Sequence, residues 1–316
     1  MRPPHVASRR ELRHARAAEL ALTALFAASV FAVFAAAAGL LLAAPFAALV
    51  PAPARMLLYG LSAAGALCIA YAVFIEPYRL TIRRVEVRSP KLGPAPVRLA
   101  HLSDIHVRDW SRIEERLVEE VRALRPDLIL ISGDLPARRG SVAAVRRLMG
   151  ELASIAPTYC SRGNFEYRDV GHAPLLEGSR AVWLLNELVT LRAGGASLAV
   201  AGVDAGDENT ARSLGRSSDP KIFSICLYHY PDLVPELERL PYDLVLCGHA
   251  HGGQVRLPWI GALVSGSRSG TRYARGVFRS GGRTACVTQG IGCESGFIPR
   301  LRFLCPPEIV LITLTR

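Results

Sequence analysis

The sequence predicts an α/β domain that follows two membrane-spanning helices. Two uncharged apolar stretches lie near the N-terminus, at about 20–44 and 56–75. After residue 80, short apolar runs typical of buried strands alternate with amphipathic helical patterns. Nearly every group of polar residues in this part comes directly after an apolar run. In α/β sheets, ligands bind at the carboxyl ends of the strands. We therefore expect the functional residues on loops at one edge of the sheet structure.

The composition limits the class of protein. The 316 residues allow one large domain or two smaller ones, and the hydrophobic content of 50% is high for a purely soluble protein. The formal net charge is +11, although only Lys91 and Lys221 are lysines. Because no lysine-rich tail or recognised nucleic-acid motif accompanies this charge, nucleic acid is not an expected partner. Anionic lipid or phosphate is the expected partner of the arginines, and the oligomeric state is not indicated.

The N-terminal part is expected to form a membrane anchor. Residues 1–19 are a basic tail, and both apolar stretches are long enough to span a bilayer as helices. Arginine is concentrated before the first stretch and after the second, while the turn between them contains only Arg55. The positive-inside rule therefore predicts a helical hairpin in a bacterial inner or plasma membrane, with the domain in the cytoplasm. The alternative is export, since Ser8-Arg9-Arg10-Glu11-Leu12 resembles a twin-arginine signal.

The chain after the anchor divides into a linker with a first strand, 76–96, and the main domain, 97–316. Ser111 and Glu114 form a capping-box pattern, and the apolar positions that follow predict a helix that ends before Pro126. A second helix is expected at 143–155. Strands are expected at 97–102, 128–131, 158–160, 198–203, 222–227 and 244–247.

Seven polar residues stand directly after predicted strands and form a candidate metal-ligand set. They are Asp104, His106, Asp134, Asn164, His229, His249 and His251. Carboxylate, imidazole and amide oxygen together suit divalent ions such as Mn²⁺, Fe²⁺ or Zn²⁺. The two histidines of 248–254 alone would be weak support, since histidine is also a common core or surface residue. Together with the other five they indicate a two-metal hydrolytic site.

The order Asp-x-His, Gly-Asp, Gly-Asn, His, Gly-His-x-His resembles the calcineurin-like metallophosphoesterases from about residue 97 to the end. Gly248–Gln254 and Pro306-Pro307-Glu308-Ile309 resemble the membrane-anchored bacterial branch, which includes one type of UDP-2,3-diacylglucosamine pyrophosphatase. The resemblance implies a four-layer α/β sandwich of two mixed sheets between helices. It also implies two divalent ions, foremost Mn²⁺, with Fe²⁺, Zn²⁺ or Mg²⁺ as alternatives. The implied reaction is hydrolysis of a phosphate ester or anhydride by metal-activated water.

Position by position, the resemblance also assigns the ligands. One metal would be held by Asp104, His106, Asp134 and His251, and the other by Asp134, Asn164, His229 and His249. Asp134 would bridge the two ions. All seven residues would then be catalytic through the metal-activated water.

One position departs from the family pattern. Where the family usually has Gly-Asn-His followed by an acidic residue, this chain has Gly163-Asn164-Phe165-Glu166, so the histidine that would protonate the leaving oxygen is replaced by Phe165. Three interpretations follow. The substrate is an anhydride, whose phosphate leaving group needs little protonation; or Arg162, Arg168 or His172 supplies the charge; or the chain binds without catalysis.

The function expected from these patterns is metal-dependent phosphohydrolysis at the cytoplasmic membrane face. A lipid-linked pyrophosphate such as UDP-2,3-diacylglucosamine would explain an anchor beside a phosphate-cleaving site. The alternatives are a broad-specificity or exported phosphodiesterase or phosphomonoesterase, and a non-catalytic membrane sensor that binds metal or nucleotide.

Overall fold

A computed structural model describes residues 50–167, 174–294 and 300–316 and contains two six-stranded sheets. The strands of the first sheet are β1 (Thr81–Arg88), β2 (Val97–Leu102), β3 (Leu128–Ser132), β4 (Thr158–Ser161), β5 (Val182–Trp183) and β14 (Glu308–Thr315). Those of the second are β6 (Glu187–Ala193), β7 (Ala196–Val203), β8 (Phe223–Tyr228), β9 (Leu244–Cys247), β12 (Gly276–Ser280) and β13 (Arg283–Val287). A separate small hairpin pairs β10 (Arg256–Leu257) with β11 (Gly261–Ala262).

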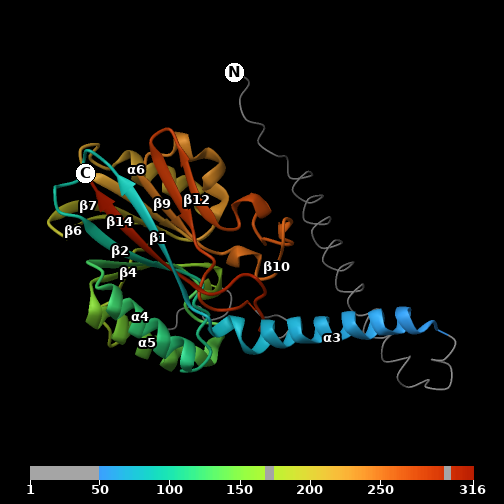
Figure 1. Cartoon of the computed structure of the whole chain (residues 1–316). Coiled ribbons are helices and arrows are strands. Elements are labelled where there is room, and N and C mark those ends of the chain that lie inside the picture. The colour runs from blue at the N-terminus through green and yellow to red at the C-terminus, as the bar shows by residue number, and fades with distance from the viewer. Residues whose placement is uncertain (1–49, 168–173, 295–299) are drawn as a thin grey trace.

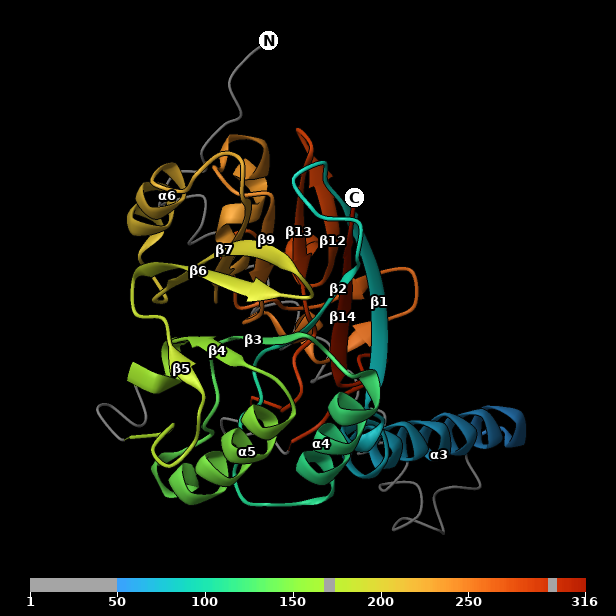
Figure 2. The ribbon, with the colours of Figure 1, turned by 90° about the vertical axis from the view of Figure 1, so that its left-hand side faces the viewer.

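Helices cover the outer face of each sheet. The α-helices are α3 (Ala52–Phe74), α4 (Arg112–Leu124), α5 (Val142–Ile155) and α6 (Glu208–Arg216), and the 3₁₀ segments are η1 (Glu76–Tyr78), η2 (Arg139–Ser141), η4 (Pro231–Arg239), η5 (His251–Gly253) and η6 (Thr271–Tyr273). Side chains of α4 and α5 share a core with the first sheet, and side chains of α6 and η4 share one with the second. A third core fills the space between the sheets. The expected α/β class is therefore confirmed (Figures 1 and 2).

The strand order brings certain strand ends to one place. The first sheet has the order β1-β14-β2-β3-β4-β5, and the second β12-β13-β9-β8-β7-β6. In the first sheet β2, β3 and β4 are parallel neighbours, and in the second β8 and β9 are. Because parallel strands end at the same edge, the loops after these five strands can converge.

Helix α4 shows how closely the local sequence determines one element. The backbone N–H and the hydroxyl of Ser111 donate to Glu114 Oε2, at 2.9 and 2.6 Å, so the predicted capping box is confirmed. The apolar face that includes Leu117 and Val121 is buried, which stabilises the fold by roughly 1.5–3 kcal/mol for each large side chain. The helix ends at Leu124, before Pro126, as expected.

The second predicted membrane span is a long helix that projects away from the domain (Figure 1). It is α3, which begins four residues before the expected 56; Pro53 lies in its first turn, where proline is tolerated. Ala52–Tyr78 is long and apolar enough to cross a membrane, and only 6% of its most apolar window is buried. The basic tail, 1–19, and the first predicted span, 20–44, lie outside the described residues, so the helical hairpin stays a prediction.

Candidate metal centre

The seven candidate ligands are on the loops that follow the five converging strands. Asp104 and His106 come after β2, Asp134 after β3 and Asn164 after β4; His229 directly follows β8, and His249 and His251 come after β9. The two sheets are joined at this point. His229 Nδ1 donates to the carbonyl of Ser132, at the end of β3, at 2.8 Å. The backbone N–H of His249 donates to the Asp104 carboxylate at 2.9 Å.

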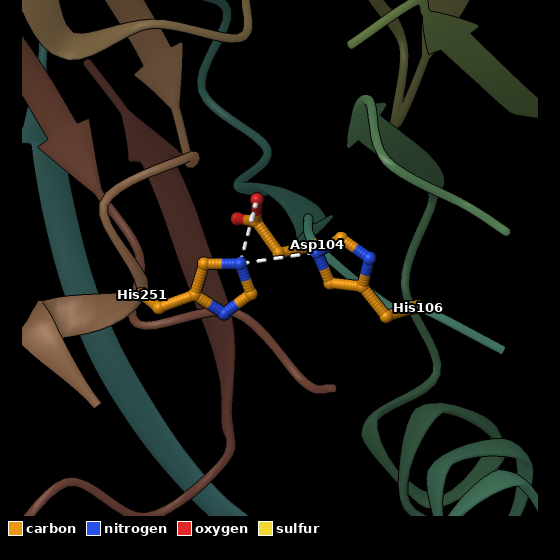
Figure 3. A group of neighbouring side chains, drawn as sticks. All are labelled: Asp104, His106 and His251. Carbon is orange, nitrogen blue, oxygen red and sulfur yellow. Dashed lines mark hydrogen bonds and ion pairs between the residues drawn. The ribbon is translucent and has the colours of Figure 1, made fainter. Parts of the chain in front are cut away.

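Asp104, His106 and His251 form the first cluster of possible ligand atoms (Figure 3). The Nε2 atoms of His106 and His251 are 3.0 Å apart, and His251 Nε2 is 3.6 Å from Asp104 Oδ1. All three side chains are buried, and they face one another from loops of the two different sheets.

Asp134, His229 and His249 form the second cluster. His229 Nε2 is 3.2 Å from Asp134 Oδ2 and 3.1 Å from Asn164 Oδ1, so the amide lies against the same imidazole. Asp134 Oδ2 is also 3.7 Å from His106 Nε2, in the first cluster. The structure thus brings all seven residues together and places the Asp134 carboxylate between the two clusters.

The backbone at this site is unusual. Five of the seven residues have left-handed φ angles between 46° and 68°. They are Asp104, His106, Asp134, His249 and His251. Residues other than glycine rarely adopt such angles, and each costs of order 1–3 kcal/mol that the surrounding structure must offset. These turns direct the side chains from the strand ends into one common space.

Two glycines permit the close approach of loops from different strands. A Cβ at Gly163 would overlap the carboxylate of Asp134, and a Cβ at Gly248 would overlap Ser103 and the carboxylate of Asp104. Both positions therefore need the absence of a side chain, whatever their φ.

Glu166 stabilises the site through hydrogen bonds to its backbone. It was not identified from the sequence as a functional residue. Its buried carboxylate accepts backbone N–H groups of Leu135 at 2.7 Å, Gly163 at 2.8 Å and Asp134 at 3.1 Å. It therefore fixes the turns after β3 and β4 relative to each other. Its place two residues after Asn164, in the acidic position of the family pattern, is the signal that could have indicated this role.

Three of the histidines are neutral at neutral pH. Burial lowers the pKa of His106 and His249 to about 4, and that of His251 well below its ordinary value. A neutral imidazole keeps a lone pair for a metal ion, which a protonated one does not.

The two carboxylates give the site a negative field. Burial raises the pKa of the Asp104 carboxyl to about 7. For Asp134, burial raises the pKa, but the charge and hydrogen bond of His229, together with His106 and the Phe165 N–H, outweigh this and hold it below its usual value. Burial lowers the pKa of His229, yet the charges of Asp134 and Asp104 raise it more. Positive charge is thus strongly favoured here. The donor set, neutral imidazoles and carboxylates in two clusters, fits divalent cations.

The residue that departs from the family pattern contributes through both its backbone and its ring. The backbone N–H of Phe165 donates to Asp134 Oδ1 at 2.8 Å, and its ring packs edge-on against His106 with the centroids 4.4 Å apart. Arg162, one of the suggested substitutes for the missing histidine, forms a bidentate ion pair with Asp204, at 3.0 and 2.7 Å. Its charge is therefore already neutralised. Arg168 and His172 lie outside the described residues.

Comparison with known proteins identifies the domain. Residues 97–253 match the calcineurin-like phosphoesterase family. The chain is 29% identical to the uncharacterized metallophosphoesterase YkuE of Bacillus subtilis, with 81% of this chain and 94% of YkuE covered. Its identity to phosphodiesterase YaeI of Escherichia coli is also 29%, covering 77% of this chain and 92% of YaeI.

A third relative has a more specific name. UDP-2,3-diacylglucosamine pyrophosphatase LpxG of Chlamydia muridarum is 26% identical, and the match covers 79% of this chain and 94% of LpxG. The family match contains all seven candidate ligands, from Asp104 to His251. The chain therefore contains a calcineurin-like metallophosphoesterase domain, the domain of a family of metal-dependent phosphohydrolases.

Proposed function

We propose that this protein hydrolyses a lipid-linked phosphate anhydride at a membrane surface with two divalent metal ions. The observation that carries the proposal is the pair of carboxylate–imidazole clusters, largely buried, with the Asp134 carboxylate between them. Helix α3 supports the membrane location, since it is long and apolar enough to span a bilayer.

In this proposal Asp104, His106 and His251 hold one ion, and His229, His249 and Asn164 hold the other, with Asp134 shared. Two bound cations would make hydroxide available from water near neutral pH and neutralise phosphoryl oxygens. The protein's own contribution is to keep three imidazoles neutral by burial and to fix the carboxylates through backbone N–H donors. The mixed nitrogen and oxygen donors favour Mn²⁺, with Fe²⁺, Zn²⁺ or Mg²⁺ as alternatives.

Phe165 supports an anhydride rather than an ester as the substrate. Its ring can neither donate a proton nor carry a charge, and Arg162 is paired with Asp204. A phosphate leaving group ionises near neutral pH and so departs without a general acid, whereas an alkoxide does not. We expect Phe165→His to leave the turnover of an anhydride within about twofold, and to speed the cleavage of an alkyl phosphodiester by about 10²-fold or more. Equal effects on both substrates would contradict this explanation.

The substrate that we propose first is UDP-2,3-diacylglucosamine, the nucleotide named in the relative LpxG. Full-length protein in detergent with Mn²⁺ should release UMP from it, and Asp134→Ala should not. Val182→Ser, at an exposed position of the edge strand β5, serves as the matched control. Wild-type protein that leaves this nucleotide intact while hydrolysing bis-p-nitrophenyl phosphate would refute the substrate but not the reaction class.

The second candidate is a broad phosphodiesterase or phosphomonoesterase outside the cytoplasm. It is favoured by the identity to phosphodiesterase YaeI and by the twin-arginine-like segment 8–12. A phosphatase reporter that functions only outside the cytoplasm, fused after Arg316, separates the two. Activity of this fusion would overturn the cytoplasmic placement. A non-catalytic sensor would be supported if the protein keeps its cellular role without detectable hydrolysis.

A further inference from the structure

The tip of the β10–β11 hairpin exposes two large apolar side chains that the proposed chemistry does not use. Pro258, Trp259 and Ile260 form the tip; the exposed fraction is 101% for Trp259 and 68% for Ile260. Trp259 also has a left-handed φ of 62°, so the turn presents the indole outward at some conformational cost. A single exposed apolar residue is ordinary on protein surfaces. The exposed tip therefore indicates a binding role only if its position in the fold supports one.

The hairpin is joined to the predicted membrane helix, α3, through Arg302 and Phe303. On one side, the Phe303 ring packs edge-on against Tyr71 of α3 with the centroids 6.4 Å apart, and the N–H of Arg302 donates to the Ala72 carbonyl at 3.0 Å. On the other side, the Phe303 N–H donates to the Gln254 carbonyl and the Arg256 N–H donates to the Phe303 carbonyl, both at 2.9 Å. This two-residue segment thus lies between the base of the hairpin and α3.

The end of α3 at this contact has the features of a membrane boundary. A helix of 23 residues is about 34 Å long, slightly more than the roughly 30 Å hydrocarbon core of a bilayer. Tyr71 lies near its C-terminal end and accepts a hydrogen bond from Arg79 at 2.6 Å, and aromatic and basic residues of this kind mark the interface. Figure 1 shows β10 on the side of the domain from which α3 projects. A bilayer that contains α3 would therefore meet this face of the domain.

The same hairpin is continuous with the candidate metal centre. The segment η5, which contains His251, leads directly into β10, and the Arg256 side chain donates back to the Gly252 carbonyl at 2.8 Å. Ala250 and Ala262 pack together in one small cluster, so β11 rests on the loop that carries His249 and His251.

We propose that the Trp259–Ile260 tip inserts into the lipid–water interface beside α3 and is a second point of attachment to the bilayer. Tryptophan suits this depth because its ring is apolar and its N–H remains near water. Two attachments prevent the domain from rotating about α3. They hold the metal loop at the membrane surface, where the head group of a lipid-linked phosphate lies. The inference rests on the proposed function for its substrate and on the structure alone for its contact.

The test uses full-length protein in vesicles of phosphatidylcholine and phosphatidylglycerol, with and without bromine on the acyl chains near the head group. The chain has three tryptophans, and the other two, Trp110 and Trp183, belong to the domain. Brominated lipid should therefore quench up to about a third of the wild-type emission, and Trp259→Phe should remove this quenching. Unchanged wild-type emission in brominated vesicles would overturn the proposal.

A second measurement separates membrane contact from other roles. In Trp259→Ser/Ile260→Ser, hydrolysis of a vesicle-embedded lipid phosphate should fall roughly tenfold, while hydrolysis of soluble bis-p-nitrophenyl phosphate stays at the wild-type rate. Val182→Ser, an exposed apolar position on β5 at the opposite edge of the first sheet from β1, should change neither rate.

The remaining outcomes also decide between explanations. Equal loss on both substrates would indicate a structural role for the tip and contradict the proposal. Loss of the cellular role without quenching by brominated lipid would indicate a protein partner and also contradict it. If the wild-type protein hydrolyses neither substrate, the proposed function fails, while the quenching result still decides the membrane contact.

Discussion

Replacing Glu166 tests whether the site depends on the carboxylate that holds its backbone turns together. The carboxylate accepts three buried backbone N–H groups, from Asp134, Leu135 and Gly163. In Glu166→Ala all three donors lose their acceptor, at about 1–3 kcal/mol each, so the free energy of unfolding should fall by roughly 3–9 kcal/mol. Because the turns that carry Asp134 and Asn164 would loosen, the affinity for Mn²⁺ should also fall, by about 10–100-fold.

Calorimetric titration with Mn²⁺ and thermal unfolding, both in detergent, measure these effects. Glu166→Gln keeps the shape of the side chain and one acceptor oxygen, so it should fall between the wild type and Glu166→Ala and should remain folded if the alanine variant does not. Glu119→Ala, at an exposed position of α4, is the matched control and should change neither quantity. A Glu166→Ala variant that binds Mn²⁺ with wild-type affinity would refute the reasoning.

Three further predictions concern the metal, the Asp134 carboxylate and His101, a buried residue of β2. Removing divalent cations with a chelator should lower Tm, because the cations bind only the folded site, and Mn²⁺ should restore it; an unchanged Tm would count against a metal centre. Asp134→Ala should abolish both metal binding and turnover, and retained hydrolysis would show that this carboxylate is not shared. Burial lowers the pKa of His101 to about 3, against about 6.5 in the unfolded chain, so stability is complete above pH 6.5 and is lost as the pH falls towards 3. Between pH 6 and 5 the free energy of unfolding should therefore fall by about 1 kcal/mol more in the wild type than in His101→Gln, and parallel pH profiles would contradict this.

The parts of the fold predicted from the sequence are those that local patterns determine. The capping box at Ser111, the apolar face of α4 and the mostly apolar runs of β2, β3, β8 and β9 each depend on neighbouring residues only. Since parallel strands end at one edge, the polar residues that follow these runs were expected to meet, and in the structure they do.

The features that sequence patterns did not reveal depend on distant pairing. Strand β14 lies between β1 and β2, parallel to one and antiparallel to the other, and nothing near Glu308–Thr315 in the sequence specifies that position. Glu76 is another example. Its buried carboxylate accepts the backbone N–H of Leu304 at 2.8 Å and that of Cys305, so it joins η1, just after α3, to a loop more than two hundred residues later. The support from Glu166 was hidden for the same reason, since two of its three partners, Asp134 and Leu135, come from the preceding strand–loop segment.

The left-handed turns at five candidate ligands have a consequence for protein engineering. Each costs of order 1–3 kcal/mol when the residue is not glycine, against a total stability of about 5–15 kcal/mol for an ordinary domain. A library selected only for resistance to heat should therefore replace these aspartates and histidines early, by glycine or asparagine, and yield sturdier proteins that no longer bind metal. Selection for a robust catalyst from this chain must hold these five positions constant and seek its gains elsewhere.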